Sequence, residues 1–428
     1  MALPMAKSDA LAARVAGLSA PGAGWLGSAR AEAAARLAAM GLPTKRDEYW
    51  RYTDPTSLTQ AAAPKAALFD AGDEADAFDG IDRLKLVFVD GVFDPAQSDD
   101  LTMAGVEITL LADAEGTDIH WARDVYGVLE ARGQAPVQRP LAALNTAYAT
   151  DGVLFRVTGK AAKPIHLIYN HKSETSDALL HHCIKVESGA EVTILESGPA
   201  AARFTKVMEV EVAKDARYHH IRTQGRDHER RAATHIFARL GAGALFKSFT
   251  VTANGRLTRN DAVIELAGDD AVAHVAGAAV GDGDFHHDDT VFITHAGQRC
   301  ESRQVFKKVL MNGAVGVFQG KILVKPGAQK TDGYQISQSL LLDGDSQFLA
   351  KPELEIYADD VKCSHGSTSG AIDEVALFYL QSRGVPKRMA QSLLVLAFLA
   401  EAIGEIEDEA IAEDIRSRLE GWLARHEH

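Results

Sequence analysis

The chain of 428 residues is long enough for two or three domains or for one elongated solenoid. Hydrophobic residues make up 46% and charged residues 24%, as in ordinary globular proteins that bury a large core. Lys and Arg number 45 against 59 Asp and Glu, and the resulting net charge of −14 argues against a protein that binds nucleic acid or rests on anionic lipid.

The first 85 residues are rich in Ala and predict helices. One apolar helical face begins near the start of the chain (Leu11, Val15 and Leu18). A second helix is expected over Trp25–Met40, ended by Gly41. Thr44 and Asp47 have the spacing of a capping box, which would begin a helical segment over Lys45–Tyr52.

From residue 85 to 360 the pattern changes to strands. Five segments show the expected alternation (Lys85–Val89, Glu191–Glu196, Tyr218–Arg222, Leu245–Thr252 and Lys321–Val324). Small turn pairs recur between such segments, at an almost constant spacing at first and at a shorter one after Gly297; they begin at Gly189, Asp215, Gly243, Asp270, Gly297, Gly313, Gly327 and Gly344. Repeated turn-then-strand units without helices favour a β-solenoid over the alternative, an antiparallel sandwich.

After residue 372 the helical pattern returns in three segments, Asp373–Arg383, Lys387–Ile406 and Asp408–Ala424. The predicted fold class is therefore mainly β, a solenoid between two α-helical domains. We expect an N-terminal helical domain over residues 1–85, a β-helix core over 86–365 and a C-terminal helical domain over 366–428.

Neither a secretory leader nor a membrane span is expected. Lys7 and Asp9 interrupt the first residues, and the most apolar run, Leu393–Ala402, is far shorter than the ~20 residues that span a bilayer. The three cysteines are too far apart to suggest a disulfide scaffold, which indicates a reducing compartment (Cys183, Cys300 and Cys363). We expect a cytoplasmic protein.

Familiar catalytic signatures are missing from the sequence. It contains no phosphate-binding Gly-x-x-x-x-Gly-Lys-Ser/Thr loop, no Gly-x-Ser-x-Gly elbow and no His-Glu-x-x-His motif. The densest group of metal-ligating residue types is His286, His287, Asp288 and Asp289, followed by His295. On a strand, His287 and Asp289 would share one face and could hold a metal ion. The alternative, which we favour, is that these side chains pair with neighbouring coils.

Cys363 and His365 are a more specific candidate for a metal or catalytic site. One residue separates them, so in an extended segment both project from one face. A thiolate beside an imidazole could bind iron or zinc, or form a Cys–His nucleophile. A buried Cys with a surface His is the structural alternative, and two ligands need others from a partner chain to complete a metal site.

The sequence around this pair, Lys351–Gly366 running on through Leu377–Gly384, closely resembles the C-terminal signature of the SufB/SufD family, and within it the SufD branch. The resemblance extends back through Gln319–Ile322, Ala328–Gln335 and the His287 to His295 stretch. Near the N-terminus it includes the stretch from Gly41–Thr44 through Tyr49–Thr53. It is dense over residues 285–385 and thinner elsewhere. SufB carries a cysteine where this chain has Ser337, and Glu-His-Glu where it has Ser364-His365-Gly366, so both departures indicate SufD.

This resemblance implies a right-handed parallel β-helix and a non-enzymatic scaffold role in the SUF iron–sulfur cluster assembly complex. It implies edge-to-edge pairing with SufB, with His365 and Cys363 as candidate ligands of a transient cluster at that interface, and no metal or cofactor in the isolated chain. It also implies that the SufC ATPase docks on the C-terminal helices, for which the candidates are Leu377, Leu380, Leu393 and Phe398. The remaining apolar surface of these helices is expected to cover the open end of the solenoid. A reduced flavin in the complex and a homodimer of the isolated chain are left open.

Two other functions are alternatives to this one. A β-helix enzyme acting on carbohydrate would need paired carboxylates and aromatic residues in a groove, and aromatics make up only 7% of the chain. A metal-dependent hydrolase would use His286, His287, Asp289 and His295. Both fit the sequence less well than the scaffold.

Overall fold

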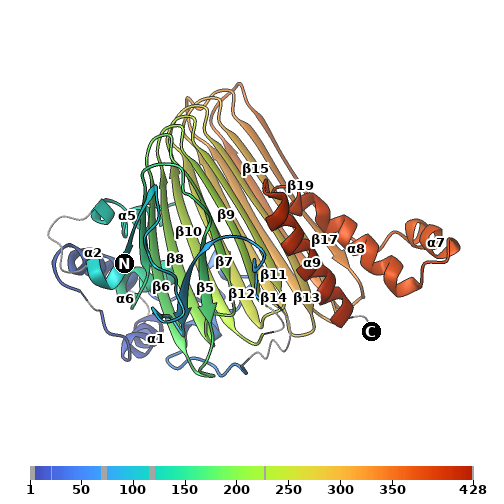
Figure 1. The fold of residues 1–428 in the computed structure, drawn as a ribbon, viewed down its shortest axis with the longest axis horizontal. Coiled ribbons are helices and arrows are strands. Elements are labelled where there is room, and N and C mark those ends of the chain that lie inside the picture. The colour runs from blue at the N-terminus through green and yellow to red at the C-terminus, as the bar shows by residue number, and fades with distance from the viewer. Residues whose placement is uncertain (1–4, 21, 69–74, 115–120, 226–227, 427–428) are drawn as a thin grey trace.

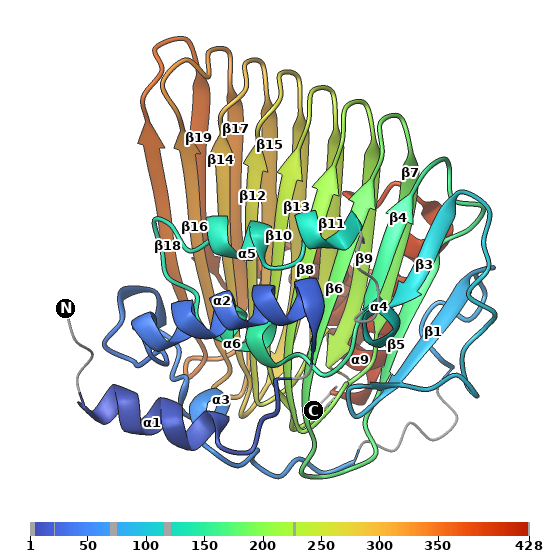
Figure 2. The ribbon, with the colours of Figure 1, turned by 90° about the vertical axis from the view of Figure 1, so that its left-hand side faces the viewer.

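The computed structural model describes residues 5–20, 22–68, 75–114, 121–225 and 228–426, and in them two long sheets lie face to face (Figures 1 and 2). The first sheet has ten strands, in the order β19-β17-β15-β13-β11-β9-β7-β5-β1-β2. The second has nine, in the order β18-β16-β14-β12-β10-β8-β6-β4-β3. From β4 onward the chain alternates between the two sheets, and from β6 onward each strand pairs in parallel with the strand two places before it. The predicted parallel solenoid is confirmed, and the antiparallel sandwich is wrong.

The strands of the first sheet are β1 (Leu84–Val89), β2 (Val92–Phe93), β5 (Ile165–Asn170), β7 (Glu191–Ser197), β9 (Arg217–Gly225), β11 (Leu245–Ala253), β13 (Val272–Asp282), β15 (Glu301–Met311), β17 (Asp332–Leu341) and β19 (Lys362–Gly370). Those of the second are β3 (Val106–Leu110), β4 (Val153–Val157), β6 (Asp177–Val186), β8 (Arg203–Val212), β10 (Arg231–Leu240), β12 (Leu257–Leu266), β14 (His286–His295), β16 (Val315–Val324) and β18 (Gln347–Ile356). All five predicted strands are present.

The coils grow toward the C-terminus. Asp177 pairs with Arg203 in an early coil, whereas Val315 pairs with Gln347 in the last one, so the later coil contains several more residues. The turn pairs at Gly313 and Gly344 lie at the opposite edge of the solenoid from the other six, which explains why the predicted spacing falls to half a coil there. Left-handed residues close many of these turns, as at Asp215 with φ of 57°.

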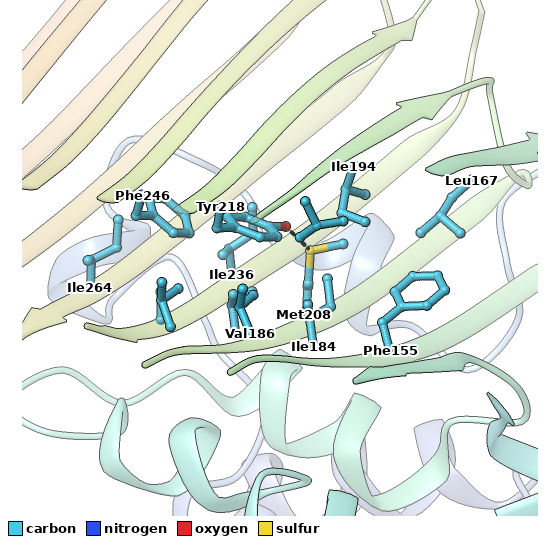
Figure 3. Packing of buried hydrophobic residues seen from close by; sticks show 14 of the residues in the cluster. Phe155, Leu167, Ile184, Val186, Ile194, Met208, Tyr218, Ile236, Phe246 and Ile264 are labelled. Carbon is cyan, nitrogen blue, oxygen red and sulfur yellow. Dashed lines mark hydrogen bonds between the residues drawn. The ribbon is translucent and has the colours of Figure 1, made fainter. Parts of the chain in front are cut away.

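The space between the sheets is divided into an apolar part and a polar part. Alternate residues of each strand point inward, and the apolar ones form one continuous cluster, part of which is drawn in Figure 3. There the hydroxyl of Tyr218 donates to the sulfur of Met208 at 3.1 Å. Buried charged residues, including Glu196, Lys206 and Lys308, also point into this space.

Helices cover both outer faces (Figure 2). The N-terminal half of the chain forms α1 (Met5–Val15), α2 (Gly24–Met40), η1 (Glu48–Trp50), α3 (Thr56–Thr59), α4 (Leu111–Ala114), η2 (Trp121–Asp124), α5 (Val128–Arg132) and α6 (Pro140–Tyr148). Apolar residues of this group pack on the second sheet, as Leu37 and Leu144 do in a cluster with Leu179 and Ala233. The expected helix over Lys45–Tyr52 is only the single turn η1, although Asp47 accepts the backbone N–H of Thr44 at 2.7 Å, as in a capping box.

Three helices follow the last strand at the predicted places: α7 (Glu374–Ser382), α8 (Lys387–Ile403) and α9 (Glu409–Arg425). Their location corrects the expectation that they cover the end of the solenoid. Val395, Leu399 and Trp422 instead pack against the outer face of the first sheet, in one cluster with Phe249 and Val305. This face is apolar, so burying it beneath two helices is favourable. Helix α7 packs on α8 and projects away from the strands (Figure 1).

Two further features differ from the predictions. Residues 111–148 contain α4 to α6, whereas strands were expected there; the apolar run of α6 fits equally a buried helix or strand. The predicted domain divisions after residues 85 and 365 fall within β1 and β19. Within the described ranges, no helix is long and apolar enough to cross a membrane.

Candidate functional site at the open end of the solenoid

The two ends of the solenoid are built differently. At the N-terminal end, the two-residue strand β2 and the short strand β3 pair antiparallel with their neighbours. At the C-terminal end, β18 pairs only with β16 and β19 only with β17 in the described part of the chain. Two strands of 10 and 9 residues thus present unpaired backbone groups side by side. Natural proteins usually cover, shorten or distort such edges.

His365 and Cys363 lie on β19, at this edge. Cys363 is in register with Gly333 of β17 and His365 with Gln335, so both side chains project from the inner face of the sheet. His365 is exposed because no further coil covers it. The extended geometry expected for the pair is therefore present, while their role as ligands stays a prediction.

Cys363 is less accessible than its neighbour. It packs against an apolar cluster of the last coils that includes Ile322 and Val324. Burial raises the pKa of the Cys363 thiol, and the Asp332 carboxylate raises it further against an opposing hydrogen bond from the backbone of Gly333. A thiol held protonated is a poor ligand and a poor nucleophile. The environment favours a structural thiol over a second ligand.

Serine side chains continue the inner face of β19. Ser337 bonds Ser367 at 3.1 Å and Ser339 bonds Ser369 at 2.9 Å, in each case between register partners of β17 and β19. Ser337 is the residue that replaces the cysteine of the SufB pattern, and only 1% of it is exposed. This position lies two residues along β17 from Gln335, beside the His365 site.

The histidines of β14 do not converge on a metal site. His287 and Asp289 point inward, where the Lys308 ammonium donates to His287 Nδ1 at 2.7 Å and to Asp289 Oδ2 at 2.6 Å. Burial lowers the pKa of His287 to about 3, so its ring is neutral. Burial alone would raise the pKa of Asp289, but the Lys308 ammonium and the hydrogen bonds from Lys308 and Asn260 outweigh it and lower that pKa. His295 is six residues further along the strand, about 20 Å away, and bonds Ser302.

His286 and Asp288, the other two residues of this stretch, face the N-terminal helices. Thr53 donates to Asp288 Oδ2 at 2.6 Å and lies 2.9 Å from His286 Nε2. Arg259 binds the same carboxylate at 2.7 Å and also the backbone carbonyl of Tyr49. These contacts join the N-terminal stretch Tyr49–Thr53 to the solenoid. Because these side chains are already bound to other residues of the chain, they are less suited to form a hydrolase site.

His181, Cys183 and Glu209 have their ligand atoms within 4.8 Å of one another, a group that sequence reasoning missed because they come from two strands. All three are buried beneath α5 and α6. The Glu209 carboxylate accepts a hydrogen bond from His181 Nε2 at 2.8 Å. It also accepts hydrogen bonds from backbone N–H groups at the start of α5, including that of Leu129 at 2.7 Å. Burial raises the pKa of Cys183 well above its usual value. The carboxylate is saturated, so the group anchors α5 to the sheet.

The candidates for ATPase docking are divided between buried and exposed positions. Leu377 is only 4% exposed, Leu380 is half-buried, and Phe398 lies beneath Lys307, whose ammonium is 4.9 Å from the ring centre. Only Leu393, at 46%, is well exposed. The exposed apolar residues of this region lie mainly on α7 and the start of α8 (Val375, Phe378, Tyr379 and Met389). Helical periodicity alone did not show which face α8 turns to the sheet.

Comparison with known proteins agrees with this arrangement. A family model described as "SUF system FeS cluster assembly, SufBD core domain" matches residues 168–398, and one described as "SufBD protein N-terminal region" matches residues 14–166. The chain is 29% identical over 401 residues to the iron-sulfur cluster assembly protein SufD of Escherichia coli, covering 90% of each chain. It is 28% identical over 418 residues to SufD of Bacillus subtilis, covering 92% of this chain and 93% of that one.

Proposed function

The chain belongs to the SufBD family of iron–sulfur cluster assembly proteins of the SUF system, and we propose that it acts there as a scaffold subunit without catalytic activity of its own. Its open end pairs with a second solenoid, of SufB type, and its C-terminal helices dock the SufC ATPase. A cluster is built transiently between the two solenoids, with His365 as the ligand that this chain contributes. The cluster is cargo that passes to other proteins.

The observation that carries this proposal is the pair of full-length parallel edges at β18 and β19. A partner with the same coil geometry can continue both sheets at once, satisfying the unpaired N–H and C=O groups. His365, exposed on the inner face of the last strand, then faces the late coils of the partner. Imidazole is a suitable ligand for iron, and one ligand from this chain leaves the others to the partner.

The test compares two substitutions on one strand. His365→Ala should leave folding and complex assembly unchanged, because a surface imidazole contributes little to stability. Cluster formation by the complex should fall sharply. Ser364→Ala is the matched control, since Ser364 is also exposed but lies on the opposite face of β19. Cys363→Ser should have a milder effect than His365→Ala. Clusters that form at the normal rate in the His365→Ala complex would refute the ligand role.

ATPase docking is supported by the exposed apolar surface of α7. Val375 is 77% exposed and Phe378 is 70% exposed, on a helix that projects from the solenoid. Removing all three C-terminal helices would be a poor test, because it would uncover the apolar face around Phe249. Val375→Ser combined with Phe378→Ser should abolish ATPase binding without loss of stability. Val92→Ser is the control, an apolar residue 60% exposed at the other end of the molecule.

A further inference from the structure

Two unsatisfied groups lie next to each other at the edge of the solenoid. Gln335 of β17 is fully buried, and its side-chain oxygen Oε1 has no hydrogen-bond partner. His365 of β19, the register partner of Gln335, makes no hydrogen bond within the described chain. A buried carbonyl oxygen without a donor costs about 1–3 kcal/mol. The neighbouring imidazole carries an N–H that could satisfy it.

The register of the neighbouring residues shows that such a contact is within reach. On its other side, Gln335 Nε2 donates to Oε1 of Gln304 at 2.9 Å, and Gln304 is its register partner on β15. Further along β17 and β19, the serine partners also bond one another, at 3.1 Å and 2.9 Å. Inward side chains of register partners therefore form ladders here, about 4.8 Å apart. His365 occupies the next rung after Gln304 and Gln335.

A glycine on the opposite sheet makes room for this ladder. Gly320 of β16 faces the same space, and a Cβ atom there would lie 2.0 Å from Nε2 of Gln335. Any larger residue at Gly320 would therefore displace the amide. Both residues are buried, so this close approach lies inside the last coils and not at their exposed edge.

We propose that Gln335 is a positioning residue for His365: its buried Oε1 accepts one ring N–H and so holds the other ring nitrogen, with its lone pair, toward the partner chain. Because His365 is exposed and is the register partner of Gln335, its side chain is free to turn toward this oxygen. Histidines that bind metals commonly donate their second N–H to a carbonyl, which fixes the tautomer and the ring orientation. The ligand role rests on the proposed function, whereas the hydrogen bond does not.

The hydrogen bond is tested by the tautomer of His365 in the isolated full chain labelled with ¹⁵N-histidine. Nitrogen chemical shifts at neutral pH distinguish the two neutral tautomers, and the His365→Gln spectrum identifies the signal. One tautomer should dominate in the unaltered protein, and Gln335→Met should give a mixture. Gln335→Glu, which keeps an acceptor at the same position, should restore the single tautomer. Ser337→Ala, on the same strand and face, is the control and should change nothing.

The positioning role is tested in the assembled complex. Loss of a hydrogen-bond partner of a metal ligand lowers affinity about 10- to 100-fold, so Gln335→Met should release the cluster faster by a similar factor while assembly is unchanged. The proposal would be overturned if Gln335→Met left the tautomer populations of His365 unchanged, or if it left the rate of cluster release unchanged. The proposed function fails separately, if His365→Ala complexes build clusters normally.

Discussion

Replacing Lys308 by Met should destabilise the solenoid from within. The Lys308 ammonium is buried between the sheets and donates to both His287 and Asp289. Met has nearly the same length but no charge, so the variant leaves the Asp289 carboxylate buried without its ammonium partner. Asn260 still donates to it at 3.1 Å, and His287 Nδ1 lies 3.4 Å away. The perturbation thus removes one charge and creates no large cavity.

Breaking a buried ion pair by removing one partner costs about 3–5 kcal/mol. An unfolding entropy of about 2.1 cal/mol/K per residue gives about 0.9 kcal/mol/K for a chain of this size, so Tm should fall by about 3–6 °C. Adding Asp289→Asn should recover most of the loss, because the second change removes the uncompensated charge. The neighbouring Lys307 is also buried but pairs with the half-exposed Glu401, so Lys307→Met leaves no buried charge unpaired and should cost less than Lys308→Met.

Thermal and urea unfolding measure the free energy of unfolding of these variants and of Asp289→Asn alone. The double-mutant cycle of Lys308 and Asp289 then gives the coupling energy between the two side chains. A Lys308→Met protein as stable as the unaltered chain would refute the argument. Zinc provides a second check, because a metal site at His287 and Asp289 would be freed by removing the lysine. We expect no stabilisation of the variant by zinc.

Three further predictions follow from buried groups and from the proposed role. Burial lowers the pKa of His295 to about 4 in the folded protein. Between pH 6.5 and 4 the histidine is therefore protonated in the unfolded chain but not in the folded one, so the folded protein loses stability as the pH is lowered through this window. The loss from His295 amounts to about 2 kcal/mol at pH 5. Other buried histidines, such as His182 and His287, add to the loss, so His295→Gln should reduce the loss of stability between pH 7.5 and 5 by this share; an unchanged loss would contradict it. Glu209→Gln should cost about 2–3 kcal/mol and expose α5 to limited proteolysis, because the carboxylate holds the backbone of Leu129 and Glu130; resistance equal to that of the unaltered protein would contradict it. The purified chain should neither hydrolyse ATP nor carry stoichiometric iron and sulfide, and either finding would disprove the scaffold role.

The solenoid could be predicted from the sequence because its signal is local and repeated. Turns recur once per coil. They require left-handed backbone conformations, as at Asp215 and Gly243, and Asp and Gly are therefore found there in the sequence. The three C-terminal helices were also predictable, since Asp373 and Asp408 cap two of them with their side chains. Each of these features is determined by residues close together in the chain.

What could not be predicted depends on contacts between distant residues. The sequence of α8 is apolar on more than one side, so it did not show that Leu399 faces the first sheet and Leu393 faces solvent. The group of His181 and Glu209 comes from neighbouring strands, one coil apart in the chain. The environment of His365 also depends on Gln335 in the preceding coil, which only the strand register brings beside it.

If His365 ligates a cluster shared with the partner chain, its ring nitrogen is magnetically coupled to that cluster. The direct measurement is electron–nuclear double resonance on the reduced cluster of a complex in which only this chain carries ¹⁵N-histidine. We predict a ¹⁵N coupling to the cluster that disappears in the His365→Ala complex. A cluster without any ¹⁵N coupling, or a coupling that persists when His365 is replaced, would contradict the account.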